Sequence, residues 1–322
     1  MLFLSKNCTR MFLTSRLVGG FPLKHIVSVS LGSSERDKKV TVNLLGEEFV
    51  IERRGTDGDI KKAISLLQEL DGKVDAVGLG GIDVYLVAGN RRYPVKDGLK
   101  MLKALQVTPG CDGSGLKNTL EREIVNQLFR EGIFYKGQKV LLVSTVDRFG
   151  MAEALAQNGA DLIIGDLIFA LGIPVPLRSL KTVSFLAMLL LPIIGKMPFR
   201  LIYPTGQKQK KELPKYRKYY EWAEVIAGDF HYIRRYLPSK VQGKTILTNT
   251  TTKEDEELLR SRGARMLITT TPEIEGRSFG TNVMEAIFLA LLNKKWEEAM
   301  PEDYLRLIKD LGLKPSIRRL ND

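Results

Sequence analysis

The sequence predicts a two-domain α/β protein, with a Rossmann-like doubly wound parallel sheet preceded by a smaller N-terminal α/β domain. Three observations support this prediction. The chain has 322 residues, which is long enough for two hydrophobic cores. Its apolar content of 44% and charged content of 27% are ordinary for a globular protein. After about residue 137, short unbroken apolar runs alternate with helical ones, which is typical of a parallel sheet covered on both faces.

The smaller domain is expected over residues 25–136, on the substrate side of the protein. Its strand-like runs lie at 25–31, 40–45, 48–52, 74–79, 84–87 and 92–95. Its helix-like runs lie at 59–70, at 98–105 and from residue 115 onward. Asp57 or Asp59 is the expected N-cap of the first of these helices.

The Rossmann-like domain is expected over residues 137–300, with an apolar and basic insert at 170–220. Its predicted strands are 139–144, 161–165, 225–228, 245–248 and 266–269. Its predicted helices include 150–158, 254–262 and 280–296, and a C-terminal helix is expected within 301–322. Residues 1–24 are basic and lack an apolar run of signal-peptide length. They are interpreted as a flexible extension, a transit-like segment or a mis-started one.

The cysteine and histidine content argues against a metal site. Cys8 and Cys111 lie far apart, and His25 and His231 are the only histidines, so no zinc-binding spacing occurs. A reduced cytoplasmic location is the expectation. The net charge of +12 comes largely from the N-terminus and from 196–244. Because no nucleic-acid module accompanies this charge, we expect a solvated surface that attracts anionic substrates or lipids, and no specific nucleic-acid partner.

The insert contains the apolar run 183–195, which Pro192 interrupts. It is too short to span a bilayer, which needs about 20 residues. Three interpretations remain open: a buried helix, the interface of a homodimer, and peripheral membrane contact through 183–220, completed by the basic run that follows.

A dinucleotide site is predicted at the first strand–helix turn of the second domain. Ser144, Thr145, Arg148 and Gly150 occupy this turn, where a helix N-terminus binds pyrophosphate in Rossmann proteins. Asp147 would repel a phosphate, and Arg148 would compensate. Asp166 follows the next strand, about 20 residues on, at the spacing of a ribose-binding acid. A carboxylate there favours NAD over NADP, although Asp166 is equally suited to cap the following turn.

Polar residues also follow the later strands. Gly228–Phe230, Thr248–Thr252 and Thr269–Glu273 each lie just past a strand, where open parallel sheets bind ligands. Thr248, Asn249, Thr269 and Thr270 are therefore predicted to contact the cofactor. Arg277 and Ser278, before the long helix, are predicted to hold a substrate anion, or else to form a capped helix start with a surface ion pair.

The catalytic candidates lie in the smaller domain. Lys117 and Asn118 follow a tight turn at Asp112, and a lysine near a helix N-terminus is electrostatically disfavoured. Lys117 with Asp83 or Asp112 is therefore predicted to exchange a proton with a substrate hydroxyl while hydride moves to nicotinamide. Asn118 is predicted to bind substrate. The alternative is that Lys117 is an ordinary solvated helix residue.

Four segments carry a resemblance to a known group of proteins. Val29-Ser-Leu-Gly-Ser-Ser34, Gly78-Leu-Gly-Gly-Ile-Asp83, Asp112-Gly-Ser-Gly-Leu-Lys117 and Gly276-Arg-Ser-Phe-Gly-Thr-Asn282 resemble bacterial proteins labelled quinate 5-dehydrogenase, from about residue 25 to the end. The domain order is similar to that of shikimate/quinate dehydrogenase-like Rossmann proteins. Two departures are clear: Lys117 follows Val107-Thr-Pro109 at a longer distance than in shikimate dehydrogenases, and the glycine-rich turn is absent.

The resemblance implies an NAD(P)-dependent oxidoreductase acting on a small hydroxylated and carboxylated, quinate- or shikimate-like substrate. Two alternatives stay open. One is a non-catalytic Rossmann protein that binds a nucleotide or metabolite. The other is a membrane-associated reductase of a lipid or acyl substrate.

Overall fold

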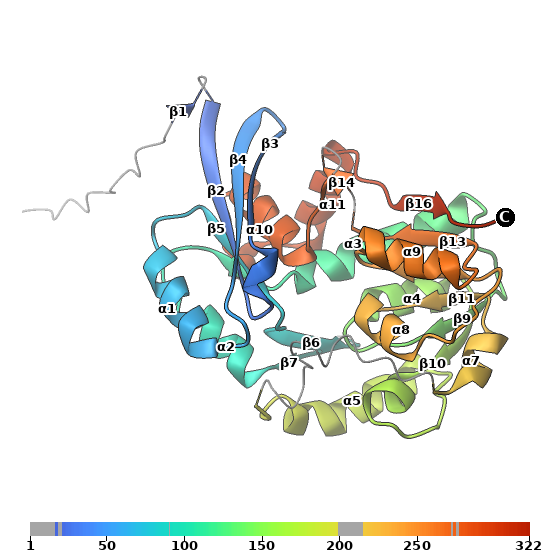
Figure 1. Ribbon diagram of the computed structural model, residues 1–322. Coiled ribbons are helices and arrows are strands. Elements are labelled where there is room, and N and C mark those ends of the chain that lie inside the picture. The colour runs from blue at the N-terminus through green and yellow to red at the C-terminus, as the bar shows by residue number, and fades with distance from the viewer. Residues whose placement is uncertain (1–16, 19–20, 90, 199–214, 272, 275–276) are drawn as a thin grey trace, which may run out of the picture.

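The computed structural model describes residues 17–18, 21–89, 91–198, 215–271, 273–274 and 277–322 (Figure 1). It confirms the α/β class: two mostly parallel sheets lie side by side, with helices packed around them. Helices α3 (Ser114–Arg130) and α10 (Thr281–Leu292) run between the two sheets.

The first sheet has the strand order β3-β4-β2-β5-β8, and β1 pairs with β2 beside this path. Strands β4, β2, β5 and β8 are parallel, whereas β3 is an antiparallel edge strand. Helix α1 is capped by Asp59, whose carboxylate accepts hydrogen bonds from two backbone amides, as predicted. The bounds are β1 (Leu17–Val18), β2 (Phe21–Ser30), β3 (Lys38–Leu44), β4 (Glu47–Gly55), α1 (Ile60–Leu70), β5 (Ala76–Gly80) and β8 (Gly110–Cys111).

The second sheet has the order β10-β9-β11-β12-β13-β16, and all strands except β16 are parallel. The first strand in sequence, β9, lies between β10 and β11, so the sheet is doubly wound and reverses direction next to β9. The bounds are β9 (Lys139–Leu142), α4 (Phe149–Gln157), β10 (Asp161–Ile164), α7 (Arg217–Trp222), β11 (Val225–Ala227), α8 (Phe230–Tyr236), β12 (Thr245–Thr248), α9 (Lys253–Ser261), β13 (Met266–Thr269) and β16 (Ser316–Arg319).

Burial on both faces explains the unbroken apolar strands of the second sheet. Val140, Leu141 and Leu142 are adjacent in β9 and all fully buried, so side chains on both faces of the strand are covered. One apolar core joins the sheets, because Ile26 of β2 and Leu142 of β9 belong to the same buried cluster. A second core lies on the other face of the second sheet. The two sheets therefore form one packed unit.

Two predicted strands of the first domain form a separate hairpin. Among the described strands, β6 (Tyr85–Ala88) and β7 (Arg91–Pro94) pair only with each other, outside the main sheet. The hairpin packs against α5 (Leu180–Ile194), and α2 (Lys96–Leu102) follows it. A second small hairpin, β14 (Glu273–Ile274) with β15 (Arg277–Ser278), precedes α10.

The chain ends differ from the prediction. Strand β2 begins at Phe21, ahead of the expected start at residue 25, and Lys24 makes a 2.8 Å ion pair with Glu47. Residues 1–16 and 19–20, with most of the predicted extension, lie outside the described residues. The predicted C-terminal helix is α11 (Pro301–Asp310), after which the chain returns to the second sheet as β16. Helix α10 ends at Leu292, before the predicted residue 296, and its C-cap Asn293 has the left-handed conformation.

The apolar run 183–195 forms most of α5. Only one stripe of this helix, at Val183, Ala187 and Leu191, is buried. The interpretation of a buried helix therefore holds for this stripe only. Among the described helices, none has both the length and the apolar character needed to cross a bilayer.

Candidate functional site

Polar side chains from both sheets meet where their strands end. Asp83 follows β5 of the first sheet, Asp147 follows β9 of the second, and Lys117 lies on α3 between them. The Nζ atom of Lys117 donates a 2.6 Å hydrogen bond to Asp147 Oδ1 and lies 3.6 Å from Asp83 Oδ1. One buried ammonium therefore bridges the carboxyl-terminal edges of the two sheets.

This pairing fixes the charge state of Lys117. Burial alone would lower its pKa, but the carboxylates of Asp147 and Asp83 outweigh that effect and raise the pKa above its ordinary value. Burial likewise opposes ionisation of Asp147, yet Lys117 and then Arg148 hold the pKa of Asp147 at about 2. At neutral pH Lys117 therefore carries a proton and Asp147 does not.

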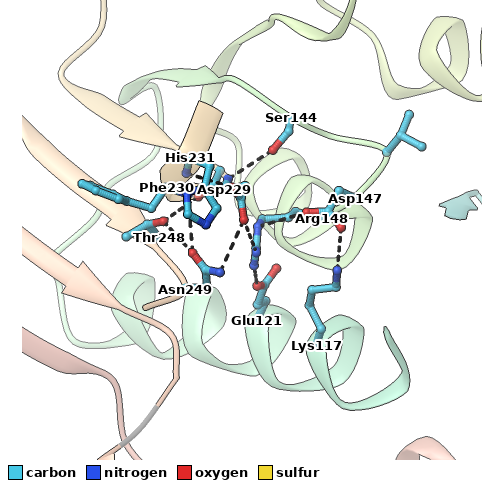
Figure 2. Close-up of polar contacts among 12 residues, drawn as sticks. Lys117, Glu121, Ser144, Asp147, Arg148, Asp229, Phe230, His231, Thr248 and Asn249 are labelled. Carbon is cyan, nitrogen blue, oxygen red and sulfur yellow. Dashed lines mark hydrogen bonds and ion pairs between the residues drawn. The ribbon is translucent and has the colours of Figure 1, made fainter. Parts of the chain in front are cut away.

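Arg148, next to Asp147 in the turn after β9, is almost fully buried. Its guanidinium pairs with Glu121 of α3 and lies 3.1 Å from an oxygen of Asp229, which follows β11. Figure 2 shows Arg148 directed toward both carboxylates, with Lys117 of the same helix as Glu121 reaching Asp147. These ion pairs outweigh burial and raise the pKa of Arg148. We call Lys117, Asp83, Asp147, Arg148, Glu121 and Asp229 the Lys117 cluster.

Asp112 does not join this cluster. Its carboxylate accepts hydrogen bonds from the backbone amides of Val84, at 2.6 Å, and of Ser114, at 2.8 Å. It thereby ties the loop after β5 to the start of α3. Gly113 begins that helix with φ 91°, and a Cβ there would meet the backbone of Asn282 at 2.6 Å. Asp112 and Gly113 together set the position of Lys117 one turn later.

The predicted pyrophosphate turn is already filled by the chain itself. The backbone amide of Thr145 donates to both carboxylate oxygens of Asp166, at 2.9 and 3.1 Å, and Val146 donates at 3.1 Å. Asp166 therefore caps this turn, which was the structural alternative for it. Ser144 Oγ accepts the amide of Asp229 at 3.1 Å. A pyrophosphate bound to these amides would have to displace Asp166 from them, and the cofactor role of this turn stays a prediction.

Gly150 serves helix packing. A Cβ at this position would lie 2.2 Å from the carbonyl oxygen of Asn118, so the glycine allows α4 to approach α3 closely. Asn118 follows Lys117 on α3, and its Oδ1 is buried beside Gly150 with no hydrogen-bond donor among the described residues.

The threonines of the later strands do gather at one edge of the second sheet. Thr248 Oγ1 donates to the carbonyl of Gly228 at 2.8 Å and contacts Asn249 Oδ1 at 3.0 Å. Thr269 pairs with Thr248 in the sheet and is buried. The Thr270 amide donates to the Thr248 carbonyl at 2.7 Å. Backbone bonds account for most of this set, so its predicted cofactor role stays a prediction.

The residues predicted to hold a substrate anion lie in the small hairpin before α10. Arg277 and Ser278 form β15, whose backbone pairs with β14, and their side chains lie outside the described residues. Their role toward a substrate anion stays a prediction.

A small pocket opens beside Lys117. Its volume is about 10 Å³, which is about the space of one water molecule. Tyr85 and Val87 of the β6–β7 hairpin form one wall, and Asn118, Asp147 and Phe149 contribute to the others. Sequence reasoning missed Tyr85 and Glu121. The sequence did contain an indication of Glu121, because this residue lies four positions after Lys117 and thus on the same helix face.

The chain matches two protein families, neither of which has an assigned activity. The chain matches the family described as domain of unknown function DUF8754 over residues 115–320. Residues 25–112 match a second family, domain of unknown function DUF8753. A comparison with curated protein sequences finds no match.

Several solved structures resemble the chain broadly. The arabinose-binding protein AraP from Geobacillus stearothermophilus is 10% identical, with 93% of this chain and 97% of that one covered and a TM-score of 0.41. The glucose-galactose-binding protein GanP from the same organism is 8% identical, with 93% and 98% covered and a TM-score of 0.38. A galactofuranose-binding protein is 12% identical, with 90% and 98% covered and a TM-score of 0.36.

The predicted resemblance to quinate and shikimate dehydrogenases is wrong, and so is the NAD(P)-dependent oxidoreductase function derived from it. The matching families are described only as domains of unknown function, and the three solved structures named above are described as sugar-binding proteins. In the turn after β9, the amides predicted to bind a phosphate are bonded to Asp166, and Arg148 is paired with Glu121. NAD or NADP as a bound cofactor stays a prediction. The DUF8754 match covers well over half of the 322 residues of this chain, so the chain belongs to the DUF8754 family of proteins of unknown function.

Proposed function

We propose that this protein binds a small, neutral, hydroxyl-rich molecule at the Lys117 cluster and releases it unchanged. The observation that carries the proposal is the position of Lys117 Nζ, between Asp83 at the edge of one sheet and Asp147 at the edge of the other. Ligands of open α/β sheets bind at these carboxyl-terminal edges, next to the strand where the order reverses. In the second sheet that strand is β9, which Asp147 follows.

The charge balance of the cluster supports a neutral ligand. Two cations, Lys117 and Arg148, face four carboxylates: those of Asp83, Asp147, Glu121 and Asp229. The cluster is therefore net negative, and a phosphate or carboxylate brought into it would be repelled. This argues against nucleotides and acidic metabolites.

The donor and acceptor pattern supports hydroxyl groups. The carboxylates of Asp83 and Asp147 only accept hydrogen bonds, whereas Lys117 only donates them. A hydroxyl does both, so neighbouring hydroxyls on one molecule can satisfy an ammonium and a carboxylate together. Asn118 also lines the pocket, and a side-chain amide can both donate and accept hydrogen bonds. Tyr85 gives the pocket an aromatic wall against which a sugar ring can pack.

Admission of the ligand requires a local opening. The pocket of about 10 Å³ holds about one water, so the ligand takes the place of the Lys117–Asp147 contact. The β6–β7 hairpin carries Tyr85 and Val87 and pairs with no other described strand, which makes it the wall that moves. The sheets themselves stay together, because they share one core.

The charge states support binding without chemistry. A general acid or base works best when its pKa lies near the working pH. The pKa of Lys117 is raised and that of Asp147 is about 2, so neither group exchanges protons near neutrality. Lys117 is accordingly a ligand-positioning donor in this proposal.

The test is a ligand panel read by thermal shift and then by calorimetry. The panel contains neutral monosaccharides and polyols, hydroxy acids, AMP, NAD and NADP. We expect saturable binding of a neutral polyhydroxylated member, whose proton NMR spectrum is unchanged after long incubation with the protein. Binding confined to the anionic members, or conversion of the ligand, overturns the proposal.

Matched variants test whether the ligand binds at the Lys117 cluster. Lys117→Met is expected to weaken binding at least tenfold, whereas Lys61→Met, at an exposed lysine of α1, leaves it unchanged. If Lys117→Met does not fold, Asp83→Asn serves instead, because it keeps the side chain's size while removing its charge. Unchanged affinity in the folded variant would place the ligand elsewhere and overturn the site.

A further inference from the structure

Helix α5 presents an apolar face to solvent. Its buried stripe is Val183, Ala187 and Leu191. Two residues beyond each of these lie Phe185, Leu189 and Ile193, with exposed fractions of 57%, 52% and 65%. These three are spaced by four and so share one helix face.

No charged side chain interrupts the apolar face. Met188 of the same helix is also exposed, and no charged residue occurs between Thr182 and Gly195. In Figure 1, α5 forms one outer edge of the molecule, opposite α11. An exposed apolar helix face of this kind marks an interaction site rather than ordinary protein surface.

A basic pocket adjoins the C-terminal end of α5. The amide of Lys96 donates to the carbonyl of Gly195 at 2.8 Å, and a Cβ on Gly195 would lie 2.3 Å from the Pro94 carbonyl. This contact places the helix end against α2. The pocket there has a volume of about 320 Å³ and an apolar floor of Pro94 and Leu99, and its lysines are Lys96, Lys100, Lys103 and Lys196.

The pocket's positive charge is barely offset. Within the described part of the chain no acidic residue lines it, and the nearby Asp97 lies 3.7 Å from Lys100. Four ammonium groups around an apolar floor match a ligand with a phosphate and an apolar tail. An anionic phospholipid has both parts, and its neighbours in a bilayer would meet the apolar face of α5.

We propose that the outer face of α5 and the lysine pocket form one membrane-docking surface, which seats this protein on a bilayer containing anionic phospholipid. The helix has 15 residues and therefore lies in the plane of the interface rather than across it. Phe185, Leu189 and Ile193 insert among the acyl chains, and the lysines bind lipid phosphates.

A second copy of the chain fits this surface less well. A two-fold symmetric dimer uses the same patch of both subunits, so a dimer through this whole surface would enclose the lysine pockets of both subunits in one interface. Like charges would then oppose the contact, in a chain whose net charge is already +12. An anionic bilayer attracts these same lysines instead.

Vesicle co-sedimentation of the full chain tests the proposal. We expect binding to phosphatidylcholine vesicles that contain about 30 mol% phosphatidylglycerol, because the anionic headgroups attract the lysines. Vesicles of phosphatidylcholine alone should bind at least about tenfold more weakly, and raised salt should weaken the anionic binding. Equal binding to both vesicle types, or binding to neither, overturns the proposal.

Surface variants separate the contribution of the lysine pocket from that of the apolar face of α5. Lys100→Glu with Lys103→Glu should reduce binding to anionic vesicles by about tenfold or more. Leu189→Ser with Ile193→Ser should reduce it on both lipids. The matched control, Leu305→Ser with Lys309→Glu on α11, should bind as the wild type does. Equal binding by all variants overturns the proposal, as does a dimer in sedimentation that the α5 variant dissociates. These outcomes are independent of the polyol assay.

Discussion

The ammonium of Lys117 lies 2.6 Å from the carboxylate of Asp147, and this contact joins a helix that leaves the first sheet to a turn that follows the first strand of the second. Both side chains are largely withdrawn from solvent, so removing one partner leaves a buried charge uncompensated. The same pair that holds the sheet edges together is the one a ligand has to separate.

Lys117→Met is expected to destabilise the protein without changing its fold. Among the described residues, the cation left to Asp147 is the more distant Arg148, 3.6 Å away, so we expect a loss of about 3 kcal/mol in the free energy of unfolding. Chemical denaturation measures this loss. Lys61→Met, at an exposed position, should change the free energy of unfolding by no more than about 0.5 kcal/mol. Equal effects of the two substitutions would show that the ion pair contributes nothing to the free energy of unfolding.

Asp166→Ala is expected to destabilise the turn after β9. Three hydrogen bonds from the Thr145 and Val146 amides would be lost, which costs about 1–3 kcal/mol. Asp161→Ala, in the neighbouring strand, removes only an exposed ion pair with Arg178 and should cost less than about 1 kcal/mol. A ribose-binding role would instead leave stability unchanged, so denaturation curves distinguish the two roles of Asp166.

Asp166 also shows where sequence reasoning reaches its limit. Its spacing from the turn is the same whether its carboxylate binds a ribose or caps backbone amides, and only the folded chain decides between them. The strand–helix alternation was predictable, because burial on both faces requires the unbroken apolar runs. The exposed face of α5 was not, because its apolar run is the same whether its partner is protein or lipid. Glu121 escaped notice because its partner, Arg148, is remote in sequence.

Glu285 is expected to make stability depend on pH. Burial, and then the charge of Asp112, raises the pKa of this carboxyl to about 7, although Tyr304, Trp296 and the Leu116 amide donate hydrogen bonds to it. The folded protein therefore binds this proton more tightly than the unfolded chain does. The stabilisation is complete below the ordinary pKa of 4.5 and is lost as the pH rises through about 7.

The size of this effect follows from the shift in pKa. We expect the free energy of unfolding to fall by up to about 3 kcal/mol between pH 4.5 and pH 8 through Glu285 alone. Glu285→Gln should flatten the profile over that interval. Denaturation midpoints at several pH values check this, and a wild-type slope that survives in Glu285→Gln would assign the dependence to another group.

Gly150→Ala is expected to be more disruptive than a change at a glycine in open space. The added Cβ would lie 2.2 Å from the Asn118 carbonyl, so α4 would have to move away from α3, at a cost of about 3 kcal/mol. Gly46 has φ +81°, and a Cβ there would meet no atom of the described residues within 4 Å, so Gly46→Ala should cost only about 1–2 kcal/mol. Thermal unfolding of both variants compares the costs. A smaller loss for Gly150→Ala would mean that the helices separate easily.

The most direct test of the Lys117 cluster as a binding site is a crystal structure of the chain with the polyol or sugar that the panel identifies. The predicted result is a ligand whose hydroxyl groups contact Asp83 and Asp147, with the Lys117–Asp147 distance increased from 2.6 Å and the β6–β7 hairpin displaced. A ligand bound elsewhere while the Lys117–Asp147 pair stays intact would contradict the account.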